Sequence, residues 1–455
     1  MNSLIINSDN ENINNLIKES QSTKKHGGPF LEWVPFEELT DVEKIGQGGF
    51  SQIFKATWKV NDGISLDGTV IRSKQKIVLK VLSNSQNVDT EFLNELKHTY
   101  DFNNKNIIKC YGVTQDPQTK NYAFILEYAK NGDLHHFIHK NFEASTWSDK
   151  IKYLHYIIIG IEDIHEKNIV HRDLHSGNIL VNNHHTIITD LGFCQPAAID
   201  SNLSRKSQIY GIIPYMAPEL FKSQSYSYAS DIYSLGMIMW ELTSGHRPFH
   251  DQEHGPKLIL DILDGKRPEI TEDTPELWAN LMKRCWHPDP SQRPKIEEIR
   301  ELNNNDKLYL ITHRSEDETK KYYPDKYDIW LEFNEAEKKR LEMIKSKKQF
   351  VKNPGYEHPN SRYYSISLNS MLESINSTIS DMFSNDDNLF SNDFFDIMNI
   401  NSNQINDLVN SNINGYSNTE KFRKHFLDEL LEEEIIDQDD FKRRRIAEYF
   451  VECFK

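Results

Sequence analysis

A short segment near the middle of the chain carries residues that could perform acid–base and metal chemistry. Asp173 is followed five residues later by Asn178, between two apolar runs. This spacing suits a carboxylate that accepts the proton of a hydroxyl group, beside an amide oxygen that binds Mg²⁺. Asp190 follows the strand-like run 186–189 and adds a second oxygen ligand of the kind that Mg²⁺ prefers. Each residue alone could be a cap or a turn residue, so the prediction depends on their joint order.

Two further charged residues lie nearer the N-terminus. Lys80 ends the apolar run 77–79, and Glu95 follows fifteen residues later inside a predicted helix. A pair between these side chains would direct the Lys80 ammonium group at the phosphates of a nucleotide. Taken alone, the lysine could equally be the solvated end of a strand.

A glycine-rich turn precedes both of these residues. Residues 45–53 have the sequence IGQGGFSQI. Glycines two positions apart let a backbone approach anionic oxygens closely and present its N–H groups to them. A plain hairpin explains such a turn equally well. A Rossmann site would need a helix directly after the turn, whereas a strand is predicted here.

The elements that must position these residues belong to two classes. Short β-branched runs predict strands in the first third of the chain, and longer apolar patterns predict helices after Gly132. Strands followed by helices indicate an α+β fold with two lobes of different class. The main predicted strands are residues 42–45, 52–60 and 70–81, and the main predicted helices are residues 90–100, 147–165 and 230–244.

Composition marks the ends of the chain as different from its middle. Residues 1–30 are rich in Asn, Ser and Lys and are expected to form a flexible arm. Residues 303–360 are expected to be a charged helical extension. Residues 361–418, which are rich in Asn, Ser and Asp, are expected to be disordered, and a bias towards Asn explains them as well as a function does. Short amphipathic helices are predicted in residues 419–455.

The charge and the cysteines narrow the classes of partner and compartment. Lys and Arg number 53 against 69 Asp and Glu, and the net charge of −16 disfavours nucleic acid and anionic membrane surfaces as partners. Cys110, Cys194, Cys285 and Cys453 lie far apart, which predicts neither a zinc site nor a disulfide framework. No apolar run is long enough for membrane insertion. We therefore expect a soluble protein of the cytoplasm.

Taken together, the motifs resemble those of eukaryotic protein kinases over about residues 36–302. Further matches to that family are Ala217-Pro218-Glu219, the segment 231–236, and Cys285-Trp286 followed by Arg293. Residues 171–180, with the sequence HRDLHSGNIL, are similar to those of fungal kinases in the tyrosine-kinase-like group. The resemblance implies a bilobal kinase fold. A small β-rich N-lobe with one helix would span about residues 36–128, and a larger helical C-lobe about residues 131–302.

The resemblance implies a role for each residue that could do chemistry. ATP and Mg²⁺ would be the cofactors, and Lys80, held by Glu95, would contact the phosphates. Asp173 would accept the proton of the substrate hydroxyl, and Asn178 and Asp190 would hold Mg²⁺. A buried ion pair between Glu219 and Arg293 would brace the C-lobe.

The same resemblance implies an ATP-binding cleft. Leu126 would be its gatekeeper, and backbone groups of residues 127–129 would bind adenine. Val78 replaces the usual Ala and would narrow the roof over the adenine ring. The implied cofactor-binding residues are Ile45, Gly46, Gln47, Gly48, Gly49, Phe50, Ser51, Ile53, Val78, Lys80, Leu126, Glu127, Ala129 and Leu180.

The motifs say less about which amino acid of a substrate protein would accept the phosphoryl group. His175 stands where serine/threonine kinases carry a lysine, and Ile212 stands where they carry a threonine. The tyrosine-kinase pattern is also absent, and the relatives nearest in pattern favour Ser/Thr over Tyr. Arg172 predicts control by a phosphate on Ser204 or Ser207, although these serines could simply keep a surface loop solvated.

The expected function is therefore an ATP-dependent protein kinase that acts on protein substrates in intracellular signalling. One alternative is a pseudokinase, a nucleotide-binding scaffold that acts through protein interaction. Another is that the tail is the working interaction module, although nothing in residues 303–455 names a partner. The presence of Lys80, Asp173, Asn178 and Asp190 favours the active enzyme. A core that closes at Arg293 predicts that a chain ending near Asn304 still folds.

Overall fold

The computed structural model describes residues 8–22, 30–47, 51–64, 70–86, 88, 90–102, 104–183, 185–196, 209–305 and 308–374. They divide into two units. The larger unit takes in the described residues up to His254 and those of Arg267–Ile366, and the smaller takes in Gly255–Lys266 and the residues from Ser367 onward. Within the described ranges, no helix combines the length and the apolar character that a membrane span requires. The tail predictions for residues 375–455 lie outside the described part of the chain.

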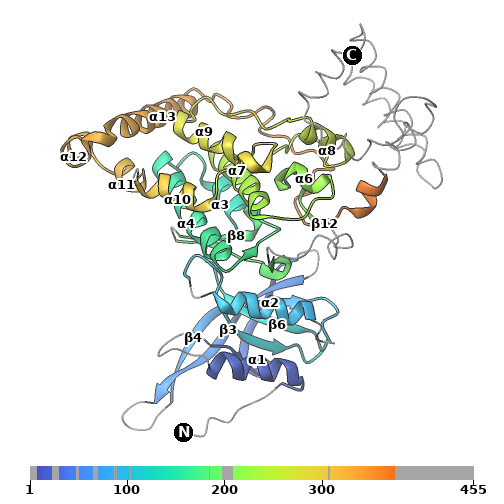
Figure 1. Ribbon diagram of the computed structural model, residues 1–455. Coiled ribbons are helices and arrows are strands. Elements are labelled where there is room, and N and C mark those ends of the chain that lie inside the picture. Colours follow the sequence, from blue (N-terminus) through green and yellow to red (C-terminus); the bar gives the residue numbers. More distant parts are fainter. Residues whose placement is uncertain are drawn as a thin grey trace, which may run out of the picture. The chain divides into compact units, whose positions relative to one another are not determined.

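The N-lobe is built on a six-stranded sheet with the order β1-β5-β6-β4-β3-β2 (Figure 1). Neighbours from β2 to β5 in this order pair antiparallel, whereas β1 pairs parallel with β5. The strands are β1 (Glu32–Trp33), β2 (Leu39–Gln47), β3 (Ser51–Ile64), β4 (Val70–Leu82), β5 (Cys110–Gln115) and β6 (Tyr122–Glu127).

The pairing of β1 with β5 depends on a glycine. Gly112 lies opposite Glu32, and a Cβ atom at residue 112 would stand only 2.0 Å from the Glu32 carbonyl oxygen. Any side chain there would push β1 off the sheet, so a close backbone approach explains the glycine.

Among the described residues, two helices pack on the N-lobe, whereas one was expected. The predicted helix is α2 (Thr90–Asp101), and a second helix, α1 (Glu11–Ser22), comes from the expected flexible arm. Ile13 and Ile17 of α1 are buried in one cluster with residues of α2 and the sheet. The Tyr100 hydroxyl of α2 also donates to the Ser20 carbonyl oxygen at 3.0 Å. The flexible-arm prediction is therefore wrong for residues 11–22, because two isoleucines one turn apart suffice to dock a short polar helix.

The C-lobe surrounds the buried helix α7 (Tyr228–Ser244), which ends at Gly245 with a φ of 75°. The predicted helix α4 (Trp147–Glu166) begins with a capping box between Thr146 and Asp149. The other helices of the lobe in the larger unit are α3 (Leu134–Asn141), α6 (Pro218–Phe221), α9 (Glu276–Cys285) and α10 (Ile296–Asn305). Its short strands are β7 (Ile169–Val170), β8 (Ile179–Asn182), β9 (His185–Ile188), β10 (Gln195–Pro196) and β11 (Tyr210–Gly211). Helix α8 (Pro256–Leu263) belongs to the smaller unit.

Within the expected helical extension 303–360, the described helices after α10 are α11 (Leu308–Thr312), α12 (Glu316–Tyr322) and α13 (Tyr327–Lys345), whereas residues 346–360 contain no helix. Its longest helix buries Trp330, Phe333 and Met343. The Phe333 ring lies 6.0 Å from that of Trp147 in α4. This extension is therefore packed into the C-lobe, and the lobe does not close at residue 302.

Two carboxylates of α13 cap helices of the C-lobe. Glu337 accepts a hydrogen bond from the Trp147 N–H at the start of α4, at 3.0 Å. Glu332 accepts one from the Leu277 N–H in the first turn of α9, at 2.7 Å. The first N–H groups of a helix have no partner within it, and a negative charge there is favourable. Some of the charged residues of this extension therefore make structural contacts.

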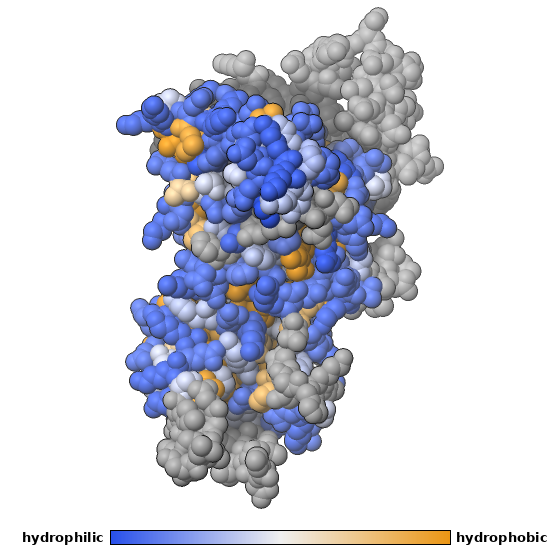
Figure 2. Space-filling view, turned by 90° about the vertical axis from the view of Figure 1, so that its left-hand side faces the viewer, coloured by the Kyte–Doolittle hydropathy of each residue, from blue (hydrophilic) through white to orange (hydrophobic). Residues whose placement is uncertain are grey.

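Apolar side chains collect inside the lobes more than on the surface. The face in Figure 2 is largely hydrophilic, with small and scattered apolar areas. One side of the N-lobe sheet carries a core around Phe124 and Leu96, and a second core includes Ile77 and Ile125. Cys110, Cys194 and Cys285 are free and buried, and Cys453 lies outside the described residues.

Candidate active site

The ammonium group of Lys80 joins two acidic residues from different elements. Its Nζ lies 2.6 Å from Glu95 Oε1 on α2 and 2.7 Å from Asp190 Oδ1. Burial alone would lower the pKa of Lys80, but the carboxylates of Asp190 and Glu95 outweigh it and hold the pKa above its ordinary value. Lys80 is therefore charged throughout the physiological range. The predicted Lys80–Glu95 pair is present. Lys80 also contacts Asp190, which is one of the two predicted Mg²⁺ ligands.

Glycine 192 makes room for Glu95. A Cβ atom at this position would lie 2.7 Å from Glu95 Oε2, well inside contact distance. Gly192 belongs to the short 3-10 helix η3 (Leu191–Phe193), which follows Asp190 directly. Because the Glu95 carboxylate rests against this backbone, the absence of a side chain at 192 lets Glu95 reach Lys80.

Asp173 and Asn178 lie together in the loop between β7 and β8. Asn178 Nδ2 donates to the Asp173 carbonyl oxygen at 2.9 Å and to Asp173 Oδ2 at 3.2 Å. The Thr189 N–H donates to the Asn178 carbonyl oxygen at 2.9 Å, which holds the residue before Asp190 against this loop. The structure thus brings the three predicted oxygen-bearing residues to one place.

The Asp173 carboxylate has two other partners. His175 Nε2 lies 3.7 Å from Asp173 Oδ2, and the Ser365 hydroxyl also donates to the carboxylate. Burial would raise the pKa of Asp173, but His175, Ser365 and His171 outweigh it, so the pKa lies below its ordinary value. Asp173 is therefore ionised and can accept a proton. The contact with Ser365, 192 residues away, had no signal in the sequence.

A carboxylate from the buried helix α7 holds the loop between β7 and β8. Asp231 accepts hydrogen bonds from the backbone N–H groups of His171 at 2.8 Å and Arg172 at 3.1 Å. Arg172 has a φ of 72°, a left-handed conformation that costs a non-glycine residue about 1–3 kcal/mol. The bonds to Asp231 offset this strain. Sequence reasoning placed Asp231 in a buried helix but missed this role.

A second buried carboxylate of α7, Glu241, was also missed. It accepts a hydrogen bond from the Tyr215 hydroxyl at 2.6 Å, and its Oε1 lies 2.8 Å from His135 Nδ1. The Tyr215 hydroxyl lies 3.2 Å from Ser176 Oγ in the segment between β7 and β8. The signal was a glutamate inside the otherwise apolar run 235–242, because a buried charge needs partners.

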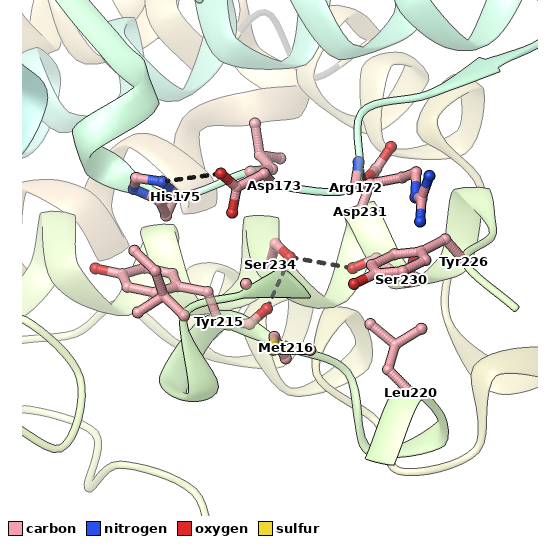
Figure 3. A pocket seen from close by; sticks show the side chains of 13 residues that line it. Arg172, Asp173, His175, Tyr215, Met216, Leu220, Tyr226, Ser230, Asp231 and Ser234 are labelled. Carbon is pink, nitrogen blue, oxygen red and sulfur yellow. Dashed lines mark hydrogen bonds and ion pairs between the residues drawn. The ribbon is translucent and has the colours of Figure 1, made fainter. Parts of the chain in front are cut away.

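A small hollow beside Asp173 is bordered by apolar side chains. Figure 3 shows Asp173 and His175 along one side of it, and Tyr215, Met216 and Leu220 along another. Ser234 Oγ donates to the Tyr215 carbonyl oxygen at 2.8 Å and so ties this wall to α7. The residues that line the hollow are Arg172, Asp173, Leu174, His175, Gly211, Ile212, Tyr215, Met216, Leu220, Tyr226, Ser230, Asp231 and Ser234.

Comparison with known protein families agrees with this geometry. The family described as "Protein tyrosine and serine/threonine kinase" matches residues 39–302, which is more than half of the chain. The chain belongs to this kinase family. Members of the family use ATP and Mg²⁺ in general.

Individual relatives of this kinase cover the same region. A protein named "Probable serine/threonine-protein kinase" from Dictyostelium discoideum is 29% identical over 286 residues, which are 59% of this chain and 15% of that protein. Mitogen-activated protein kinase kinase kinase 7 of Homo sapiens is 29% identical over 283 residues, which are 59% of this chain and 42% of that protein. The chain thus spans well under half of either relative. The likeness to fungal kinases stays a prediction.

The residues predicted to enclose adenine in this kinase lie close together. Val78 of β4 pairs with Leu126 of β6. Both Val78 and Leu180 of β8 pack against the core cluster that contains Leu126. Ala129 is buried, and the Glu127 N–H is already used, because it donates to the Lys109 carbonyl oxygen at 2.9 Å. Adenine would therefore have to use other backbone groups of residues 127–129.

The glycine-rich turn is described only in part. Gly46 and Ile53 pair across β2 and β3, and Ile53 also lies opposite Lys80 on β4. Ser51 is buried, whereas Ile45 and Gln47 are exposed. Gly48, Gly49 and Phe50 lie outside the described residues.

The donor set of this kinase fits Mg²⁺. Asn178 uses its Nδ2 atom to donate to Asp173, which leaves Oδ1 as the atom for a cation. Asp190 keeps its side chain 32% exposed even though Oδ1 contacts Lys80. Oxygen ligands of this kind, few in number and open to water and phosphate, are those that Mg²⁺ uses in phosphoryl transfer.

The predicted ion pair of the C-lobe is present. Arg293 Nη1 and Nη2 each lie 2.7 Å from one carboxylate oxygen of Glu219. Both residues are buried, and two parallel bonds make a geometrically specific contact. The phosphate prediction is not tested, because Ser204 and Ser207 lie outside the described residues. Arg172 stacks on the Tyr226 ring at 4.3 Å.

Proposed function

We propose that the chain is an active protein kinase that transfers the γ-phosphoryl group of MgATP to a serine or threonine hydroxyl of a protein. The observation that carries this proposal is the double pairing of Lys80 with Glu95 and Asp190. A scaffold that did not transfer phosphate would not need both this buried, paired cation and an ionised carboxylate at Asp173. Family membership and the names of the relatives support the same activity.

Each residue of the site would contribute a separate part of the reaction. Lys80, oriented by Glu95, would contact the ATP phosphates and stabilise negative charge there. Asp173 would orient the acceptor hydroxyl and take its proton as the new oxygen–phosphorus bond forms. Asn178 and Asp190 would hold Mg²⁺, which supplies positive charge to the transferred group when it is bound. Val78, Leu126 and Leu180 would enclose adenine.

The test is phosphate transfer from labelled ATP to dephosphorylated casein by the full chain. Asp173→Asn should keep ATP affinity within a few-fold while it lowers kcat by about 10³-fold or more, because the removed interaction acts in the transition state. Lys80→Met should also abolish transfer. Equal transfer by the wild-type chain and Asp173→Asn would rule out Asp173 as the base. ATP binding without transfer in the wild-type chain would favour the nucleotide-binding scaffold.

We propose serine and threonine as acceptors because the relatives described above are named as serine/threonine or mitogen-activated kinases. Phosphoamino acid analysis of the labelled casein tests this directly. Phosphoserine and phosphothreonine are expected. Phosphotyrosine as the main product would contradict the assignment.

A further inference from the structure

A segment far along the chain reaches the catalytic carboxylate. The Ser365 hydroxyl donates to Asp173 and lies 2.8 Å from Oδ1 and 2.6 Å from Oδ2. The Asp173 side chain is almost fully buried, so few groups could approach it. If Asp173 is the base, Ser365 occupies the position of an acceptor hydroxyl.

We call residues 346–366 the strap. Figure 1 shows the chain passing from the end of α13 along the C-lobe to β12 (Ile366–Ser367). Backbone hydrogen bonds fasten the strap to residues 245–254. The His358 N–H donates to the His250 carbonyl oxygen at 2.8 Å, and the His254 N–H donates to the Asn360 carbonyl oxygen at 3.3 Å. These bonds fix the path of the strap independently of most of its side chains.

One anchor of the strap is Tyr363, two residues before Ser365. Its hydroxyl donates to the Pro248 carbonyl oxygen at 3.0 Å. Its ring meets that of His254 edge-on at 4.7 Å, and the Arg247 guanidinium lies 4.5 Å from the ring centre. A side chain held on three sides limits how far the next residues can move, so the Ser365 hydroxyl is directed at Asp173.

The end of the strap contacts the residues around Asp173 in the way that a bound substrate peptide would. Its last residue, Ile366, begins β12, which pairs with β11. Gly211 of β11 lines the hollow beside Asp173 together with Ile212 and Met216. Adding a strand to an exposed edge is a recurrent way to bind an extended peptide. Both the hydroxyl contact and the strand pairing therefore resemble a substrate complex.

On the basis of the function proposed above, we propose that Ser365 is phosphorylated by its own chain, and that the strap covers the substrate site until this occurs. Ser365 Oγ attacks the γ-phosphorus of ATP. The bond from this phosphorus to the bridging oxygen of ADP breaks as the new bond forms, and the hydroxyl proton passes to Asp173. ADP and phosphoserine 365 are the products.

The product cannot keep the contact that the hydroxyl makes. A phosphate group carries a charge of about −1.5 to −2, and it would stand beside the buried carboxylate of Asp173. Like charges at such a distance repel, and the hydroxyl donor is lost. Phosphorylation therefore releases the strap and opens the site to hydroxyl groups of other proteins.

The first experiment measures the order of the reaction. The full chain is treated with a phosphatase, freed of it and incubated with MgATP, and phosphate on Ser365 is followed by mass spectrometry. The fraction phosphorylated per minute should stay constant over a 100-fold range of protein concentration. A rate proportional to concentration would show that one chain phosphorylates another, and would overturn the proposal.

The second experiment compares variants for transfer to casein and for amide hydrogen exchange in residues 353–366. Ser365→Ala keeps the strap docked, whereas Ser365→Glu places a charge beside Asp173. We expect Ser365→Glu to phosphorylate casein roughly tenfold faster than Ser365→Ala, within the usual range of coupling between sites, and to exchange faster in the strap. Tyr363→Ala should resemble Ser365→Glu. The exposed Ser367 is the matched control, and Ser367→Ala should behave as the wild-type chain.

The outcomes separate this proposal from the proposed function. Casein phosphorylation without phosphate on Ser365 would overturn the role of Ser365 and leave the kinase function standing. Equal casein rates and equal exchange in Ser365→Ala and Ser365→Glu would overturn the covering role of the strap. Transfer to neither casein nor Ser365 would contradict both proposals.

Discussion

The position of the Glu95 carboxylate depends on the missing side chain at residue 192. A methyl group there would meet Glu95 Oε2 at 2.7 Å. The end of a glutamate can move aside easily, so Gly192→Ala should leave the fold intact but separate Glu95 from Lys80. We expect kcat/KM to fall by about 100-fold, since a displacement of about 1 Å in a site can have this effect. Steady-state kinetics measures the fall in kcat/KM, and thermal unfolding tests whether the fold is intact.

A double-mutant cycle isolates the cause of that loss. If Gly192→Ala acts through Glu95, it should lower kcat/KM further by less than about threefold in a Glu95→Gln background. Full additivity of the two substitutions would show that the methyl group acts elsewhere, for example on Asp190.

A lysine in the C-lobe gives the fold a pH dependence. Lys150 of α4 is buried, and burial lowers its pKa from 10.5 to about 8, although Asp273 opposes this effect. Its Nζ donates to the Thr243 carbonyl oxygen at 3.2 Å and lies 4.6 Å from the Trp147 ring centre. Between pH 8 and 10.5 the unfolded chain therefore holds more protons at this residue than the folded chain. The free energy of unfolding rises with pH across that window.

Lys150→Met tests this sign. We subtract the free energy of unfolding of the variant from that of the wild-type chain at each pH. This difference should increase by about 2 kcal/mol from about pH 7.5 to pH 9.5, because one pKa unit corresponds to about 1.4 kcal/mol. Urea unfolding at several pH values measures the difference, in which the titration of all other groups cancels. A difference that does not change with pH would show that Lys150 is not buried as an ammonium group.

At the scale of elements, α13 stabilises the C-lobe through its polar residues as well as through its buried apolar side chains. Glu337 caps α4 at Trp147 and also lies 2.7 Å from Arg340 Nη2. Arg340 is itself 2% exposed and donates to the Glu143 carbonyl oxygen at 3.0 Å. Removal of one charge from this group leaves a buried guanidinium without its carboxylate.

Glu337→Gln should therefore lower the free energy of unfolding by about 2–3 kcal/mol, because a cap and a buried charge pair are both weakened. Glu335→Gln on the exposed side of the same helix is the matched control and should change it by less than about 0.5 kcal/mol. Chemical unfolding of both variants provides the comparison. Equal effects would contradict the capping role.

At the scale of the whole molecule, the extension and the strap do different things. A chain that ends at Asn305 lacks α13 and exposes Trp147 and the first turns of α4 and α9. The expectation that it folds is therefore revised. We predict that it unfolds at least 10 °C below the full chain or does not fold, since several kcal/mol of packing and capping are lost.

A chain that ends at Ser346 keeps α13 but lacks most of the strap. It should unfold close to the full chain and phosphorylate casein without the delay that strap release imposes. Differential scanning calorimetry and progress curves distinguish the two truncations. Similar stability of both chains would show that α13 does not belong to the folded core.

The chemistry of the site could be predicted from the sequence wherever it depends on short spacing and order. Asp173 and Asn178 share one loop, and Lys80 and Glu95 end up 2.6 Å apart on the strand and helix predicted for them. Hydrophobic periodicity predicted α2, and long apolar runs predicted α4 and α7, all close to their observed bounds. Local backbone geometry and the spacing of apolar residues act over a few residues, so a single sequence is enough to predict the elements that they form.

The remaining features join residues that no local rule connects. Helix α1 was hidden by its polar composition, because only the N-lobe core shows that Ile13 and Ile17 are buried. On α13, tertiary packing turned Arg340 inward and left Leu341 exposed, since a paired guanidinium can be buried while a leucine faces water. The contact of Ser365 with Asp173 spans 192 residues and depends on the anchoring of the strap. The sequence by itself determined the reactive groups, and tertiary structure decided which hydroxyl lies beside Asp173.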